Sequence, residues 1–137
     1  MASQVFDVSE LDNFARSMSR TAQSIQKSQK SFLRKEGTKL KTRTVREARK
    51  IGKKSGKYLK SIKRGKVYTY DGALAIRTYS AAPHAHLIEN GHRMVTHDGQ
   101  EVGFVRGYHV FENAGKDFEP QYQRDVEDFL DEEVEQL

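Results

Sequence analysis

The sequence predicts an α+β fold: a long N-terminal helix, a small antiparallel sheet of about four strands with a short helix inserted, and a C-terminal helix. Three patterns predict this order: apolar residues at three- and four-residue steps near the start, alternation around Asp71-Gly72, and helical spacing near the end. The 137 residues have the size of one domain. We expect a single domain over 1–137, with a charged helix over 1–52, a sheet over 57–110 and an acidic helix over 117–137.

The N-terminal segment has the features of one long helix. Asp7 is expected to cap it, Glu10 to complete a capping box, and Phe6 to pack on Leu11. The pattern weakens at Gly37, and whether this glycine bends or breaks the helix is left open. Glycines end the helical pattern near residue 52. The apolar seam consists of Leu11, Phe14, Met18, Ala22, Ile25 and Phe32.

Two hairpins are expected in the middle of the chain. Residues 58–70 and 73–79 are strand candidates joined by Asp71-Gly72, a dipeptide that favours a two-residue hairpin turn. Residues 93–96 and 101–105 form the second pair. Between the hairpins, Pro83 suits the first turn of a short helix over 82–90, and Gly91 suits its left-handed cap.

The C-terminal helix is expected to begin at about Phe111 or Asp117. Pro120 fits best in its first turn, because proline inside a helix removes a hydrogen bond. Residues 110–115 are therefore expected to form a separate turn. The apolar stripe of this helix consists of Val126, Phe129, Leu130 and Val134.

Charge is segregated along the chain. Between Lys27 and Lys66 there are 17 Lys or Arg residues and two acids, Glu36 and Glu47, whereas residues 112–137 hold ten acids and two bases. This pattern favours electrostatic pairing of the basic segment with the acidic helix, within one chain or between neighbouring copies. The alternative is a basic module that binds nucleic acid through residues 27–66, although aromatic side chains for base stacking are few there.

The sequence argues against several kinds of chemistry. The chain has no cysteine, which excludes disulfides, thiolate zinc sites and cysteine nucleophiles. Five histidines lie between residues 84 and 109, but on a helix His84 and His86 would project roughly 200° apart. A serine nucleophile motif and a phosphate-binding glycine loop are also absent from the sequence. We therefore expect no enzyme activity, no catalytic residue, no cofactor and no metal site.

The sequence also lacks the signals of a membrane protein. No apolar run approaches the ~20 residues of a bilayer span. The first residues lack the charged start and apolar stretch of a signal peptide. We expect synthesis in the cytoplasm and no membrane contact.

A family resemblance rests on residues 84–114. The run His86-Leu87-Ile88-Glu89-Asn90-Gly91-His92 is followed by Val102-Gly103, Arg106-Gly107, His109-Val110 and Glu112-Asn113-Ala114, and is preceded by Ser-Gly-Lys-Tyr-Leu-Lys-Ser-Ile at 55–62. This order resembles the tail-completion or head–tail joining minor structural proteins of long-tailed phages, the "gene product ten" family of HK-type lambdoid siphophages. The resemblance covers roughly residues 45–120. Asn90 and Tyr108 depart from the family pattern, which commonly has an aromatic residue and a proline there.

The resemblance implies a non-enzymatic phage or prophage structural protein that completes the tail and joins it to the head connector, as part of an oligomeric ring. Its implied partners are connector and tail proteins and further copies of itself, in the virion at the head–tail interface. Non-specific contact with DNA remains open.

Particular residues of the motif have expected roles. Leu87 and Ile88 anchor the short helix on the sheet, and Gly91 reverses the chain before His92. Glu89 would fix this reversal by accepting backbone N–H bonds or by pairing with an arginine. The long N-terminal helix and the segment 92–107 are the expected contact elements. The interaction residues are expected to be Arg93, Arg106, Lys53 and Lys54.

Overall fold

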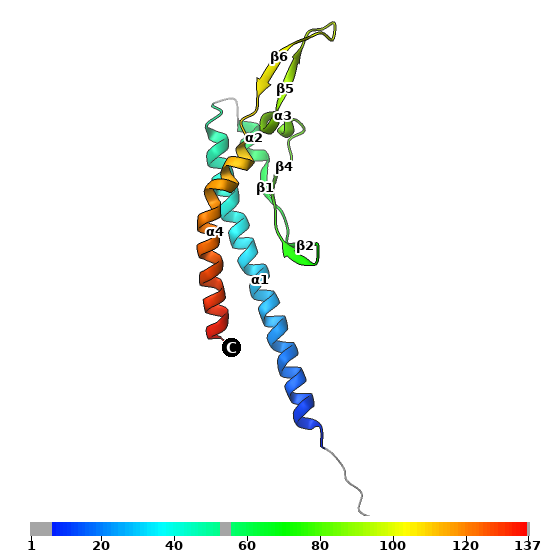
Figure 1. Ribbon diagram of the computed structural model, residues 1–137, viewed down its shortest axis with the longest axis vertical. Helices are drawn as coiled ribbons and strands as arrows, with labels where there is room; N and C mark the ends of the chain where they lie inside the picture. The colour runs from blue at the N-terminus through cyan, green and yellow to red at the C-terminus, as the bar shows by residue number, and fades with distance from the viewer. Residues whose placement is uncertain (1–6, 53–55, 137) are drawn as a thin grey trace, which may run out of the picture.

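The computed structural model describes residues 7–52 and 56–136, and it has the predicted α+β fold. Helix α1 (Ser9–Arg49) and helix α4 (Val110–Glu135) lie side by side and run in opposite directions (Figure 1). The described residues between them in sequence form helices α2 (Gly56–Ser61) and α3 (Ala85–Asn90) and six short strands. A small core of Ala48, Tyr58, Ile62 and Val110 joins the end of α1 to the start of α4.

Helix α1 starts one residue later than the capping pattern predicts. Val8 occupies the cap position without a side-chain hydrogen bond, so the predicted Asp7 capping box is wrong. The Asp7 carboxylate instead accepts the Ser9 N–H at 2.9 Å, and this bond lowers the pKa of Asp7. Phe6 lies outside the described residues.

Helix α1 passes through Gly37 without a break, which answers the question that the sequence leaves open. Gly37 is buried, and a Cβ atom there would lie 2.9 Å from Arg64 Cγ and 2.9 Å from Ile76 Cδ1. The missing side chain therefore allows the first hairpin to pack directly on the helix backbone.

The first hairpin is shorter than predicted and is interrupted. The predicted strand 58–70 begins as helix α2, because Tyr58 and Ile62 are spaced by four residues and both enter the core. Strand β1 (Ile62–Arg64) pairs with β4 (Thr78–Ser80), and β2 (Tyr68–Tyr70) pairs with β3 (Ala73–Ala75), all antiparallel. The Asp71-Gly72 turn is confirmed: both residues have positive φ, 50° and 79°, as a type I′ turn requires.

The second hairpin is confirmed and consists of β5 (Gly91–Val95) and β6 (Glu101–Arg106). In the structure the six strands form three two-stranded ladders. Helix α3 starts at Ala85, so the prediction that Pro83 lies in its first turn is wrong. Gly91 ends α3 with φ 81° and ψ −179°, a positive-φ conformation that is more extended than a left-handed helical cap.

Helix α4 is continuous from Val110, which contradicts two predictions. Residues 110–115 do not form a separate turn, and Pro120 lies inside the helix. Val110, Ala114 and Phe118 recur at four-residue steps and are all buried. Their packing against α1 and its neighbours outweighs the backbone hydrogen bond that Pro120 removes.

Candidate assembly surfaces

The Glu89 side chain ties α3 to the start of α4. Its Oε1 accepts the Phe111 N–H at 2.9 Å, and its Oε2 accepts the Glu112 N–H at 3.1 Å. The cap residue of α4, His109, provides no side-chain cap hydrogen bond and has a φ of 50°. Glu89 therefore supplies the negative charge and the acceptors that a helix N-terminus favours.

The backbone around Gly91 and Gly107 is packed too closely for any side chain. A Cβ atom at Gly91 would lie 2.2 Å from the Val105 carbonyl oxygen, and one at Gly107 would lie 2.4 Å from the Glu89 carbonyl oxygen. The Tyr108 N–H also donates to the Ile88 carbonyl at 2.8 Å. These contacts hold the base of the second hairpin firmly on α3.

Beyond this base the second hairpin protrudes from one end of the molecule (Figure 1). All residues from 92 to 106 are exposed. We call its apolar side chains the hairpin surface. They are Met94 (46% exposed), Val95 (61%), Val102 (59%), Phe104 (62%) and Val105 (36%).

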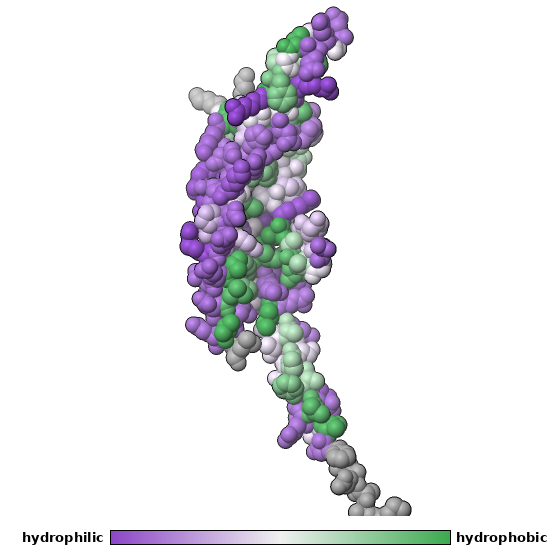
Figure 2. Space-filling model, viewed as in Figure 1, coloured by the Kyte–Doolittle hydropathy of each residue, from purple (hydrophilic) through white to green (hydrophobic). Residues whose placement is uncertain are grey.

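A second apolar surface lies at the opposite end, where α1 extends beyond the end of α4 (Figure 1). Every residue from 8 to 24 is exposed, and we call this segment the helical extension. It includes Leu11 at 67%, Phe14 at 62% and Met18 at 57% exposure. Figure 2 shows apolar residues continuing down this extension. Further along the same seam, Phe32 is half-buried and stacks on Phe129 of α4, with ring centroids 4.6 Å apart.

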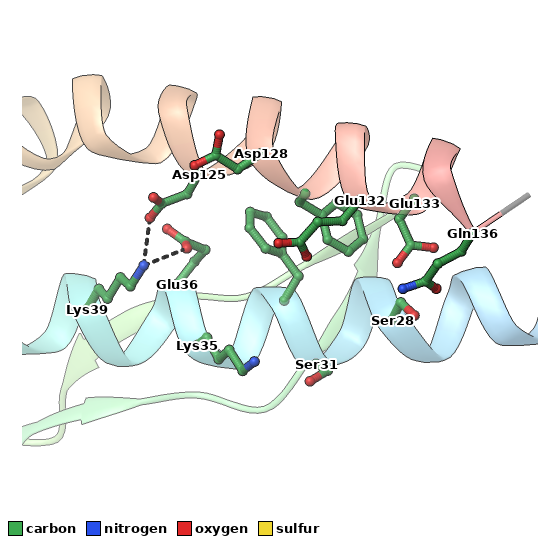
Figure 3. A pocket seen from close by; sticks show the side chains of 12 residues that line it. Ser28, Ser31, Lys35, Glu36, Lys39, Asp125, Asp128, Glu132, Glu133 and Gln136 are labelled. Carbon is green, nitrogen blue, oxygen red and sulfur yellow. Dashed lines mark hydrogen bonds and ion pairs between the residues drawn. The ribbon is translucent and has the colours of Figure 1, made fainter.

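The basic middle of the chain is partly neutralised by its own acidic helix. Lys39 Nζ lies 2.8 Å from Asp125 Oδ2, and Arg43 Nη1 lies 2.6 Å from Asp117 Oδ2. A groove of about 380 Å³ lies between α1 and α4, with Lys39 at one end and further acids of α4 along its length (Figure 3). Part of the predicted pairing between the basic segment and the acidic helix therefore lies within one chain.

Glu36 is the buried member of this groove, whereas the sequence marks it only as one of the two acids in the basic segment. Its side chain is 4% exposed, its Oε1 lies 3.4 Å from Lys39 Nζ, and its Oε2 has no hydrogen-bond partner among the described residues. Burial raises the pKa of Glu36 to about 6. The hydrogen bond from Lys39 lowers the pKa of Asp125. Glu36 lies four residues from both Phe32 and Leu40, and this spacing could have indicated that its side chain faces the interior.

The other predicted site residues lie in different environments. Leu87 and Ile88 are half-buried, and Ile88 packs against the core cluster. Arg93 and Arg106 are exposed on the second hairpin, as is His92. Among the ion pairs of the described residues, Arg93 approaches Glu101 at 3.9 Å and neither arginine pairs with Glu89. Lys53 and Lys54 lie outside the described residues.

Within residues 7–52 and 56–136, no three side chains of His, Asp or Glu are placed to hold a metal ion together. None of the helices in these ranges combines the length and apolar composition that a bilayer span needs.

Comparison with protein-family models identifies a phage family. A protein-family model with the description "Bacteriophage HK97-gp10, putative tail-component" matches residues 12–91, which include nearly all of α1, the first hairpin and α3. No curated protein and no solved structure matches the chain. The matched region covers more than half of the 137 residues. The chain therefore belongs to the HK97-gp10-like family of bacteriophage tail components.

Proposed function

We propose that this protein is a non-enzymatic subunit that completes the phage tail and joins it to the head connector, as part of an oligomeric ring. It is made in the host cytoplasm and acts in the virion, at the interface of head and tail. Family membership supports a structural role in the tail. The protruding second hairpin is the observation that supports the proposed role in joining the tail to the head connector.

A two-stranded hairpin on its own is at best marginally stable in water. Here the strands beyond Gly91 and Gly107 pair only with each other among the described residues. Several of their large apolar side chains are about half exposed or more. A partner that covers this hairpin surface would both stabilise the hairpin and remove apolar area from water.

The hairpin surface has two faces, and each face carries apolar side chains. Residues paired directly across a ladder lie on the same face, and so do residues two apart on one strand. Met94 therefore shares a face with His92 and with Val105, which pairs with His92. Val95 lies on the other face, together with Arg93 and with Phe104, which pairs with Arg93. A protrusion with two apolar faces can contact a different neighbour on each side. That arrangement supports head-to-tail contacts, which close into rings.

The charge pattern supports protein assembly over the nucleic-acid alternative. Lys39 and Arg43, both in the middle of the basic segment, are engaged by acids of α4. A module built to bind DNA through residues 27–66 would keep such cations free for phosphates. We expect weak binding to duplex DNA at ~150 mM salt, measured by fluorescence anisotropy; tight binding that weakens steeply as salt rises would favour the alternative instead.

The direct test is a stop codon in the gene of the phage or prophage that encodes the protein. Electron microscopy of the lysate should show filled heads and assembled tails that are not joined, and supplying the protein from a plasmid should restore joined particles. Joined, infectious particles that lack the protein would refute the proposed role.

A further inference from the structure

We propose that two copies of this chain pair through their helical extensions, as an antiparallel two-stranded coiled coil. The partner is a second copy of the chain, and the contact surface is the apolar seam of residues 8–24. This pair is a state of the free protein. It is distinct from the ring of the proposed function, because all subunits of a ring around a tail point in the same direction.

The first argument is the continuity of the seam. Leu11, Phe14 and Met18 follow the three- and four-residue spacing of a coiled coil, and the same register reaches Phe32. At Phe32 the seam packs on Phe129 of α4. Helix α4 ends at Glu135, and the extension continues beyond that end (Figure 1). The unoccupied part of the seam therefore has the shape and orientation of a surface that binds an antiparallel helix.

The second argument is the composition of the seam's borders. Ala15, Ser17 and Ser24 stand at the positions beside the seam, and Ala22 is a small member of the seam itself. Such small side chains allow two helices to approach closely. Antiparallel alignment with Phe14 opposite Met18 of the second copy gives two aromatic–thioether layers, a favourable contact type.

The third argument is the distribution of charge along the extension. Its acids, Glu10 and Asp12, lie near the start, and its bases, Arg16 and Arg20, lie further along. In the antiparallel alignment with Phe14 opposite Met18, Asp12 of one copy lies level with Arg20 of the other, and Arg16 lies level with Arg16 of the other copy. The two Asp12–Arg20 pairs are the charge contacts that the antiparallel arrangement gains. Parallel pairing would place like charges together, so charge complementarity selects the antiparallel arrangement.

The pair should be weak, because each copy contributes few apolar side chains over a segment about 24 Å long, at ~1.5 Å per residue. Sedimentation equilibrium of the full chain between about 1 and 100 µM should show a reversible monomer–dimer equilibrium. Met18→Glu should raise the dissociation constant at least about tenfold, because it would bury an unpaired charge. Tyr70→Glu is the control, since Tyr70 is also an exposed apolar side chain (70%, against 57% for Met18) but lies on the first hairpin, and it should leave the dimer unchanged.

Cysteine cross-linking tests the orientation, because the natural chain has no cysteine. A mixture of the Phe14→Cys and Met18→Cys proteins should form a mixed disulfide, whereas Leu11→Cys alone should not cross-link. In the antiparallel alignment the two copies of residue 11 lie about 15 Å apart along the axis, beyond the reach of a disulfide.

Three results would overturn the proposal: a monomer throughout the concentration range, a dimer that Met18→Glu leaves intact, or efficient cross-linking of Leu11→Cys. None of these results depends on the phage. The proposed role in joining tails can therefore fail independently of the dimer, and the dimer can fail independently of that role.

Discussion

The Oε1 atom of Glu89 accepts a hydrogen bond of 2.9 Å from the backbone N–H of Phe111, 22 residues further along the chain. This bond and its neighbour at Glu112 cap α4 with a side chain from α3. The residues between Glu89 and Phe111, which include the second hairpin, therefore form a loop whose two ends are held together. The orientation of the hairpin surface relative to the helices depends on this cap.

Replacing Glu89 should lower the free energy of unfolding. Glu89→Gln retains the shape but loses the charge and one acceptor, and we expect a loss of about 1 kcal/mol in urea denaturation. The control is Glu101→Gln, which weakens an exposed 3.9 Å ion pair and should change stability by less than about 0.5 kcal/mol. Equal losses in the two variants would contradict the capping role.

Gly91 and Gly99 share a φ of 81° but differ in their surroundings. An alanine at Gly99 would meet nothing within 4 Å, whereas one at Gly91 would collide with the Val105 carbonyl. Both positions have a positive φ that alanine resists, and Gly91 combines it with a ψ of −179°. The difference between the two variants therefore measures the collision at Gly91 together with the strain of its extended conformation. We expect Gly91→Ala to cost at least about 2 kcal/mol more than Gly99→Ala in thermal unfolding. Similar costs would mean that the hairpin base is not closely packed.

Gly37 and Gly115 form a matched pair inside the two long helices. A helix is more stable with alanine than with glycine by up to about 1 kcal/mol per position. Gly115→Ala should therefore stabilise the protein, because a Cβ atom at Gly115 would meet nothing within 4 Å. Gly37→Ala would press on Arg64 and Ile76. We expect it to be less stable than Gly115→Ala by about 1–2 kcal/mol in urea denaturation. A gain at both positions would show that the hairpin does not pack tightly on α1.

The buried carboxyl of Glu36 should make stability depend on pH. Its pKa rises from 4.5 to about 6 on folding, so the folded chain binds more protons than the unfolded chain between these values. The free energy of unfolding should therefore fall as pH rises through this window. Glu36→Gln removes the effect, and we expect it to be more stable than the natural protein by about 1–2 kcal/mol at pH 7.5.

At pH 4.5 that advantage should disappear, because the natural Glu36 is then protonated in the folded state. The low pKa of Asp125 acts in the opposite direction, since its stabilising effect is lost only as pH falls through and below its ordinary value of 3.8. Both measurements are made above pH 3.8, where Asp125 is largely charged in the folded and the unfolded chain, so its titration contributes little to the comparison. A Gln variant that is less stable at pH 7.5 would show that the charged Glu36 is stabilising.

Local patterns predicted the parts of the fold that depend on neighbouring residues. The seam from Leu11 to Phe32 identified α1, and Asp71-Gly72 identified a hairpin turn because both positions require positive φ. Prediction failed where long-range packing decides. Tyr58 is helical because its side chain packs in the core. Pro120 is exposed but lies in a helix whose opposite face, with Val110, Ala114 and Phe118, is buried. Spacing over a few residues does not reveal either fact.

The candidate surfaces were predicted as segments but not as side chains. The sequence indicated the long helix and residues 92–107 as contact elements, yet Phe14 and Phe104 could equally have been core residues. Their exposure follows from where α4 ends and how far the hairpin protrudes. Similarly, the sequence left two kinds of hydrogen-bond donor for Glu89, backbone N–H groups or an arginine. The position of α4 in the fold brings the Phe111 N–H to Glu89.

The central claim is that the protein acts through its uncovered hairpin surface, and complementation of a phage lacking the gene tests it most directly. The variant Met94→Ser/Val95→Ser changes one apolar side chain on each face, and Tyr70→Ser changes an exposed side chain elsewhere. With both proteins folded by circular dichroism, we expect Tyr70→Ser to restore infectious particles and the double variant to leave heads and tails unjoined, at the titre of the uncomplemented phage. A wild-type titre from the double variant would contradict the account.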